Sequence, residues 1–245
     1  MGRSTEEFVK YPRTPHIFCE YSKMSYDDKG LTLEESKALL QKKQIILEEK
    51  LDGTNVGISG TYRSHQLELF LQCRGHEITA GMHPQFDLFK SWAQARKTDL
   101  LDILGDRYVL YGEWVYAVHT KRYNALPHYF HEFDIWDRHQ QLFIDTPSRH
   151  EITQLLGLIS VPVLYAGKVD GVELLQSFIG KKSLYGDEPI EGLYGKIEEG
   201  GVTLGRFKFI DPQFTQTILD SEEKHWLHRK MEIHGLKPGT DIYAS

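Results

Sequence analysis

The chain has 245 residues, of which 40% are hydrophobic and 12% are aromatic, and its formal net charge is −6. This length is enough to bury a sizeable core, so we expect one large domain with a short appendage. The acidic balance argues against a protein that coats nucleic acid, because phosphate binding needs clustered lysine and arginine. It allows an enzyme that confines positive charge to a cleft.

Cysteine, histidine and hydropathy patterns narrow the class of protein further. Cys19 and Cys73 cannot form a disulfide framework, and the histidines lack the helical spacing of a zinc site. No segment approaches the roughly 18 uninterrupted apolar residues of a membrane span, and the start of the chain has no apolar targeting region. We therefore expect a cytoplasmic protein with no membrane partner.

Hydrophobic periodicity and cap residues predict a mixture of helices and strands without regular βαβ alternation, which favours the α+β class. In chain order we expect a helix over 32–40, strands over 44–49, 54–59 and 67–73, a helix over 84–104, strands over 108–115 and 129–136, a helix from Thr146, a helix over 172–179, and strands over 189–197 and 202–210.

The end of the chain has a different pattern, which predicts a domain boundary near residue 210. Spaced apolar residues predict one or two helices before a polar end; these are Phe214, Ile218, Leu219, Trp226 and Met231. We accordingly expect a catalytic domain over residues 1–210 and a short helical tail over 211–245.

Two acidic residues lie where a buried strand would not favour them. Glu113 is inside the apolar, aromatic strand 108–115, and Asp134 is inside the similar strand 129–136. A buried carboxylate is costly unless it is paired, hydrogen-bonded or bound to a metal ion. Each position therefore predicts either an ion pair or a functional role.

The segment Lys50-Leu51-Asp52-Gly53 comes directly after a predicted strand. If it is extended, Lys50 and Asp52 point to one side while Glu49 and Leu51 point to the other, and Gly53 permits a turn. The tetrapeptide alone is a weak signal, since it arises by chance, and its simplest explanation is a solvated lysine paired with Asp52. A functional interpretation therefore needs support from other segments of the chain.

Such segments occur downstream, in the order found in covalent nucleotidyltransferases, the superfamily of ATP-dependent ligases and messenger-RNA capping enzymes. Lys50-Leu51-Asp52-Gly53-Thr54-Asn55 resembles the nucleotidyl motif I, and the segments that resemble the later motifs are Arg74-Gly75, Tyr111-Gly112-Glu113-Trp114, Phe133-Asp134-Ile135, Glu191-Gly192-Leu193-Tyr194 and Arg206-Phe207-Lys208. Within the superfamily, the motif I and Phe-Asp-Ile segments are most similar to the RNA ligases related to the second phage RNA ligase.

This resemblance implies a nucleotidyltransferase (ATP-grasp-like) core of antiparallel sheets flanked by helices. It also implies an ATP-dependent ligase that joins RNA ends and uses Mg²⁺ or Mn²⁺. The segment 211–245 leaves no room for the oligonucleotide-binding (OB) domain that comes after the core in DNA ligases and capping enzymes. A DNA ligase, a capping-type guanylyltransferase and a non-catalytic nucleotide-binding or RNA-binding module remain as alternatives.

The resemblance also implies roles for individual residues. Lys50 would form a covalent lysyl-AMP, with Asp52 and Lys208 as the other catalytic residues. The expected metal-holding carboxylates are Asp52, Glu113 and Glu191. The expected nucleotide-binding residues are Glu49, Lys50, Asn55, Arg74, Glu113, Phe133, Glu191, Arg206 and Lys208, with Phe133 stacking on adenine and Glu49 reading its amino edge.

One motif departs from the family, which more usually has lysine at both basic positions. Strand alternation places Arg206 and Lys208 on one face, and arginine is a fixed bidentate clamp where lysine is a mobile point charge. Two segments that mix basic and aromatic residues, 10–16 and 119–123, are candidates for contacting RNA. A separate kinase or RNA-binding partner is plausible because the tail is small.

Overall fold

A computed structural model describes residues 8–18, 29–41, 44–214 and 230–244. Within these ranges the helices are α1 (Leu33–Leu40), α2 (Gln85–Ala95), α3 (Lys97–Leu104), α4 (Thr146–Leu155) and α5 (Val172–Gln176). The strands are β1 (Ile45–Glu49), β2 (Thr54–Arg63), β3 (Gln66–Cys73), β4 (His76–Glu77), β5 (Tyr108–Trp114), β6 (Phe130–Asp137), β7 (Leu142–Ile144), β8 (Ile159–Ser160), β9 (Val163–Gly167), β10 (Gly192–Glu199) and β11 (Val202–Ile210).

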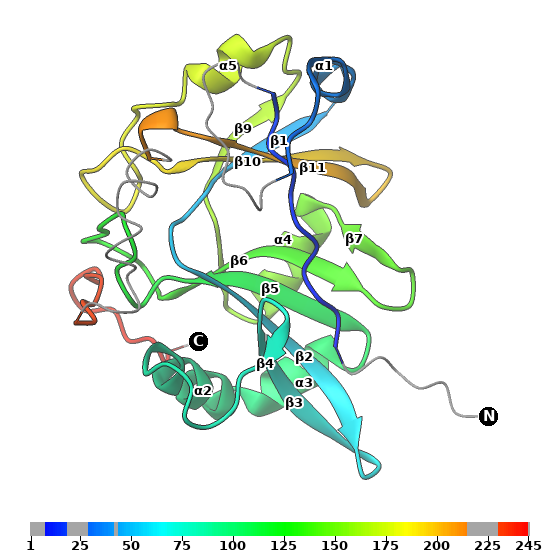
Figure 1. The fold of residues 1–245 in the computed structure, drawn as a ribbon. Helices are drawn as coiled ribbons and strands as arrows, with labels where there is room; N and C mark the ends of the chain where they lie inside the picture. Colours follow the sequence, from blue (N-terminus) through cyan, green and yellow to red (C-terminus); the bar gives the residue numbers. More distant parts are fainter. Residues whose placement is uncertain (1–7, 19–28, 42–43, 215–229, 245) are drawn as a thin grey trace.

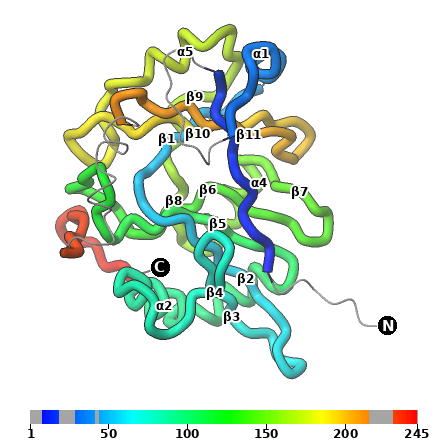
Figure 2. The backbone as a smooth tube through the Cα atoms, in the orientation of Figure 1, coloured from blue at the N-terminus to red at the C-terminus, as the bar shows by residue number. Residues whose placement is uncertain are grey.

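The strands form one hydrogen-bonded path that divides into two halves (Figures 1 and 2). The lower half runs β4-β3-β2-β5-β6-β7, and the upper half runs β11-β10-β1-β9. The pairing of β7 with β11 joins them, and every pair except β6 with β8 is antiparallel. The predicted α+β core of antiparallel sheet flanked by helices is confirmed.

Each half buries its outer face against helices. Ile45, Leu47 and Phe207 of the upper half belong to a core that includes residues of α1 and α5, while β2, β5 and β6 of the lower half pack on α2 and α3. Side chains alternate along a strand, so the neighbours of these core residues face the space between the halves. Those neighbours include Glu48 of β1 and Arg206 and Lys208 of β11.

The segment of residues 8–17, which we call the N-terminal strap, crosses from one half to the other (dark blue in Figures 1 and 2). In the upper half the Lys208 N–H donates to the Pro15 carbonyl over 2.9 Å. In the lower half the Tyr111 hydroxyl donates to the Val9 carbonyl over 2.6 Å. The strap therefore ties the two halves together.

A network of fully buried charges lies between the halves. The Arg149 guanidinium of α4 donates to Glu132 of β6 over 2.8 Å and to Glu48 of β1 over 2.5 Å. The Lys196 amine of β10 lies 2.8 Å from Glu48 and 3.1 Å from Asp134 of β6. Each of these side chains has 0% of its surface exposed. The network explains the predicted anomaly at Asp134, which is paired across the two halves.

The predicted elements differ from the structure mainly where they are short or interrupted. The long helix predicted over 84–104 is two helices, because Arg96 leaves helical geometry with φ −105° and ψ 13°. Its guanidinium donates to the Leu156 carbonyl and lies over the Trp92 ring. The strands β4, β7, β8 and β9 were not predicted, since two to five residues give little alternation.

The predicted helical tail is only partly described. Residues 212–214 are helical, as predicted at Phe214, whereas residues 230–244 contain no helix, so the prediction is wrong at Met231. The predicted helical positions at Ile218, Leu219 and Trp226 lie outside the described residues. Isolated bridges join Ile233 to Ala117 and Leu236 to Leu126. None of the helices in the described part of the chain is long and apolar enough to cross a membrane.

Replacing Arg149 by methionine, which keeps an unbranched side chain but carries no charge, tests the buried charge network. The variant Arg149→Met removes the paired cation of Glu132 and leaves Glu48 only Lys196, and uncompensated buried charge typically costs about 3–5 kcal/mol. We expect the free energy of unfolding in urea to fall by that amount.

The matched control is Arg63→Met, which breaks an ion pair of 2.7 Å with Glu77. Both side chains of this pair are about 40% exposed, so the expected loss is below about 1 kcal/mol. Equal losses for the two variants would contradict the stabilising role of the network.

Candidate active site

Lys50 lies directly after β1, at the end of the space between the halves. Its N–H donates to the Gly192 carbonyl of β10 over 3.0 Å, so the backbone is held where the strand ends. Its side chain remains 30% exposed, and its amine lies 2.5 Å from the Glu191 carboxylate. The structure therefore brings together Lys50 and Glu191, which are far apart in the sequence.

Asp52 is fixed by a loop rather than by Lys50. Its carboxylate accepts hydrogen bonds from the N–H groups of Thr120 and Lys121, each over 2.7 Å. Its own N–H donates to the Tyr123 hydroxyl over 2.8 Å. The simplest explanation of the tetrapeptide, a solvated lysine paired with Asp52, is therefore wrong.

Gly53 is required by close packing against β5. A Cβ atom on Gly53 would lie 2.7 Å from the Trp114 carbonyl oxygen and 2.8 Å from a Val115 methyl carbon, distances that real side chains do not reach. The Gly53 N–H also donates to the Glu113 carboxylate over 3.1 Å. The glycine thus lets Glu113 approach the segment that carries Lys50.

Burial and charge shift the proton affinities of this cluster. Burial raises the pKa of Glu113 to about 8 and that of Glu191 to about 7, although the Lys50 charge opposes both shifts. Burial lowers the pKa of Lys50, but Glu191 and Glu113 outweigh it and raise the pKa above its ordinary value. The amine is therefore held protonated. The positive charge near Glu113 and Glu191 does not offset the effect of burial on their pKa values.

Two oxygen atoms predicted to bind nucleotide are buried without a hydrogen-bond partner among the described residues. They are the Glu49 Oε1 and Asn55 Oδ1 atoms. Glu49 is held from the other side by the Leu184 N–H over 3.4 Å, while Asn55 of β2 pairs with Glu113 of β5. Unpaired buried acceptors are costly, so both atoms suit a ligand that donates hydrogen bonds.

A bulge in β6 sets the position of Phe133. Tyr111 of β5 pairs with Asp134 and the next residue pairs with Glu132, which leaves Phe133 as the extra residue. Bulges re-aim side chains, and here the Phe133 ring lies 6.1 Å from the Tyr194 ring of the upper half. The sequence pattern predicted a regular strand and missed this bulge.

The two basic residues of β11 have different environments, although Arg206 and Lys208 alternate with buried Phe207 and share a face as predicted. The Arg206 side chain is 13% exposed; it donates to Asp134 over 3.2 Å and lies 3.8 Å from the Phe143 ring centroid. Lys208 is near enough to Glu191 for its charge to lower the pKa of that carboxyl. Arg206 is therefore committed to Asp134, and Lys208 belongs with the Lys50 cluster.

Tyr11 of the N-terminal strap packs against Asp134 and Phe133, beside Arg206. Its hydroxyl contacts Tyr194 and donates to Asp134 over 2.5 Å, and its ring lies 5.4 Å from that of Phe133. Burial raises the pKa of Asp134, but Lys196 and Arg206 outweigh it and hold the pKa at about 2. Asp134 is thus a permanent anion to which the strap is attached.

The remaining predicted site residues are less enclosed. Arg74 is exposed at the end of β3, with a left-handed backbone at φ 51°. Of the basic segment 10–16, Lys10 and Arg13 are exposed while His16 is buried. In the segment 119–123, the backbone amides of Thr120 and Lys121 hold Asp52, which gives the segment a role in the fold. Its contact with RNA stays a prediction.

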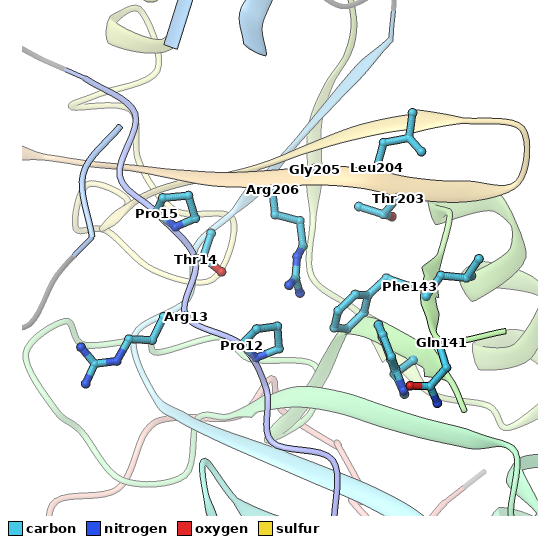
Figure 3. A pocket seen from close by; sticks show the side chains of 12 residues that line it. Pro12, Arg13, Thr14, Pro15, Gln141, Phe143, Thr203, Leu204, Gly205 and Arg206 are labelled. Carbon is cyan, nitrogen blue, oxygen red and sulfur yellow. The ribbon is translucent and has the colours of Figure 1, made fainter. Parts of the chain in front are cut away.

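A cavity of about 430 Å³ lies beside Arg206 (Figure 3). It is bounded by the strap, by the β6–β7 hairpin and by β11, and its lining residues include Pro12, Arg13, Trp136, Phe143 and Leu204. The Arg206 side chain points into the space between the strap and Phe143. The cavity thus opens beside β11. It lies between β7 and the strap, both of which pair with β11.

The three carboxylates predicted to hold a metal ion surround Lys50 but do not form a direct chelating set. Across the described ranges, no group of three or more His, Cys, Asp or Glu side chains has an arrangement that could hold a metal ion directly. The predicted attachment through the waters of Mg²⁺ needs no such arrangement, and it stays a prediction.

Comparison with known proteins identifies the family. The family model described as RNA ligase matches residues 43–210, which include every segment from Lys50 to Lys208. The chain belongs to the RNA ligase family. A comparison with curated proteins found no significant match.

Solved structures of Naegleria gruberi RNA ligase share the fold. A mutant with ATP and Mn aligns with a TM-score of 0.60 at 17% identity, covering 86% of this chain and 62% of that chain. The enzyme with PPi aligns with a TM-score of 0.58 at 16% identity, covering 90% and 64%. A mutant with AMP and Mn aligns with a TM-score of 0.59 at 15% identity, covering 86% and 62%. The chain thus spans less than two thirds of the length of these RNA ligase chains.

The geometry predicts that Glu191 controls the proton affinity of Lys50. In Glu191→Gln the carboxylate 2.5 Å from the amine is removed, and loss of an adjacent opposite charge typically shifts a pKa by about 1–3 units. We expect the pKa of Lys50 to fall by at least about one unit, as measured by NMR titration of lysine labelled at Cε.

Asp87→Asn is the control, because Asp87 is 69% exposed on α2 and pairs with Lys90. This variant should leave the pKa of Lys50 unchanged. An unchanged pKa in Glu191→Gln would contradict the ion pair.

Proposed function

We propose that the protein is an ATP-dependent RNA ligase that joins 3′-hydroxyl and 5′-phosphate ends through a lysyl-AMP intermediate. The observation that carries the proposal is the placement of Lys50 among Glu191, Glu113 and Asp52, with Lys208 close to Glu191. Membership of the RNA ligase family supports it. The ATP, AMP and pyrophosphate bound by Naegleria gruberi RNA ligase structures of the same fold support the choice of nucleotide.

The proposed reaction has three displacements. First, the Lys50 amine attacks the α-phosphorus of ATP, a nitrogen–phosphorus bond forms, the amine loses a proton and pyrophosphate leaves. Second, an oxygen of the RNA 5′-phosphate attacks the same phosphorus and releases Lys50, giving an adenylylated RNA end. Third, the 3′-hydroxyl attacks the 5′-phosphate, and AMP leaves as the phosphodiester forms.

The residues around Lys50 suit a divalent cation held through its waters. Glu191 Oε2 is buried without a hydrogen-bond partner among the described residues, and burial raises the pKa of both Glu113 and Glu191. Asp52, Glu113 and Glu191 would hold the ion. Such an ion favours the neutral amine of Lys50 and offsets charge on the phosphate.

Other side chains account for nucleotide recognition. The unpartnered Glu49 Oε1 atom would accept from the adenine amino group, and the unpartnered Asn55 Oδ1 atom, on the strand next to Glu113, would accept another hydrogen bond from the nucleotide. Phe133 offers an aromatic face for stacking, which gives contact area at little entropic cost. Lys208 would supply positive charge for the phosphates, while Arg206 is paired with Asp134.

The decisive experiment is covalent labelling with α-labelled ATP, Mg²⁺ and denaturing electrophoresis. Wild type should retain label, and Lys50→Ala should lose it completely because the bond is made to that amine. Lys90→Ala is a matched control: its side chain is 29% exposed and paired at 2.9 Å, close to the 30% and 2.5 Å of Lys50. Absence of label in wild type would sink the covalent mechanism, and label from GTP alone would indicate a guanylyltransferase.

The substrate is tested by sealing. Nicked duplexes and single strands with RNA or DNA at the junction should be joined when the junction is RNA, and the product should carry no AMP. Preferential sealing of DNA junctions would contradict the RNA assignment without affecting the lysyl-AMP step.

The metal requirement should depend on pH. Glu191 and Glu113, with pKa values of about 7 and about 8, are largely protonated at pH 6 and largely ionised at pH 8.5. A cation binds the ionised forms, so the Mg²⁺ concentration that gives half the maximal rate of lysyl-AMP formation should fall by at least about tenfold over this range. A constant requirement would contradict attachment to these carboxylates.

A further inference from the structure

The loop of residues 115–128, which connects β5 to β6, is the structure that fixes Asp52. The Thr120 and Lys121 N–H groups donate to its carboxylate, and the Tyr123 hydroxyl accepts from its N–H. These three contacts involve both the backbone and the side chain of Asp52. A loop can supply such contacts only if it is itself held in one conformation.

The C-terminal segment of residues 230–237 holds that loop by backbone pairing. The Val118 N–H donates to Glu232 over 2.9 Å, and the His234 N–H donates to Tyr116 over 3.1 Å. The Gly235 N–H then donates to the Tyr123 carbonyl over 2.9 Å. The segment therefore runs along the loop like an added strand. It pairs with residues on both sides of Thr120 and Lys121, whose N–H groups hold Asp52.

His234 makes the link between this segment and Tyr123. Its Nδ1 atom accepts a hydrogen bond from the Tyr123 N–H over 3.0 Å, and the two rings lie 4.9 Å apart. The residue is 2% exposed, and burial lowers its pKa to about 4, so the neutral ring is available as an acceptor at neutral pH. Tyr123 is likewise buried, at 3% exposure.

We propose that Tyr123 and His234 are positioning residues through which the segment 230–237 holds Asp52 beside Lys50. The chain of contacts runs from His234 Nδ1 to the Tyr123 backbone and from the Tyr123 hydroxyl to the Asp52 backbone. The inference rests on the proposed function, in that it assigns these residues to formation of lysyl-AMP. It makes the end of the chain part of the adenylation site rather than a separate tail.

Tyr123→Phe tests the hydroxyl and keeps the ring. The Asp52 N–H loses its acceptor, and outer contacts of this kind typically change metal affinity or activity by about 10–100-fold. We expect the half-saturating Mg²⁺ concentration for lysyl-AMP formation to rise by about tenfold or more. Tyr165→Phe is the control, because it also removes a tyrosine hydroxyl, which donates to the Lys168 carbonyl rather than to Asp52, the loop or the segment 230–237.

Substitutions at His234 separate positioning from packing. Asparagine keeps an acceptor oxygen near the place of Nδ1, whereas leucine fills similar space without an acceptor. His234→Asn should therefore retain a Mg²⁺ requirement near that of wild type, and His234→Leu should raise it as Tyr123→Phe does. Equal defects in both variants, with equal losses in thermal stability, would overturn the positioning role.

A readout independent of activity is hydrogen–deuterium exchange of the segment 116–124. The amides of Thr120 and Lys121 are protected by Asp52, so Tyr123→Phe and His234→Leu should expose them to faster exchange, and Tyr165→Phe should not. Unchanged exchange in Tyr123→Phe would overturn the inference. If wild type forms no lysyl-AMP but exchange changes as expected, the proposed function fails while the structural link stands.

Discussion

Two half-sheets that both carry charged inner faces can stack only if those charges are paired, and this constraint governs the molecule. Arg149 neutralises Glu48 and Glu132, while Lys196 joins Glu48 to Asp134. The pairs connect β1, β6, β10 and α4, so they fix the distance between the halves.

Lys50 lies at the edge of this charged interior, and its surroundings are also governed by the balance of charge. With Arg206 on Asp134, the interior network has three cations for three carboxylates. The cluster around Lys50 has more carboxylates than cations, as the raised pKa values of Glu113 and Glu191 reflect. The imbalance is what a ligand of opposite charge would correct. The fold thus separates a balanced set of charges, which holds the two halves together, from a set at the edge in which carboxylates are in excess.

The sequence predicted much of this, and its failures have physical causes. The Lys50 segment, the acids inside two apolar strands and the fold class were deduced from local pattern and from motif order. Three features were not predicted: the bulge at Phe133, the ion pair of Arg206 with Asp134, and the hydrogen bonds from the Thr120 and Lys121 N–H groups to Asp52. Each of them depends on partners that are distant in the chain. Strands of two or three residues, such as β7 and β8, exist only because neighbouring strands hold them.

The N-terminal strap has a consequence for how the chain reaches this state. It pairs with β11 through Lys208, so one of the first described segments to be synthesised finds its partner only when the last strand has emerged. Contacts between such distant residues carry a large loop-closure entropy and slow folding. We therefore expect the strap to dock only after β11 has formed.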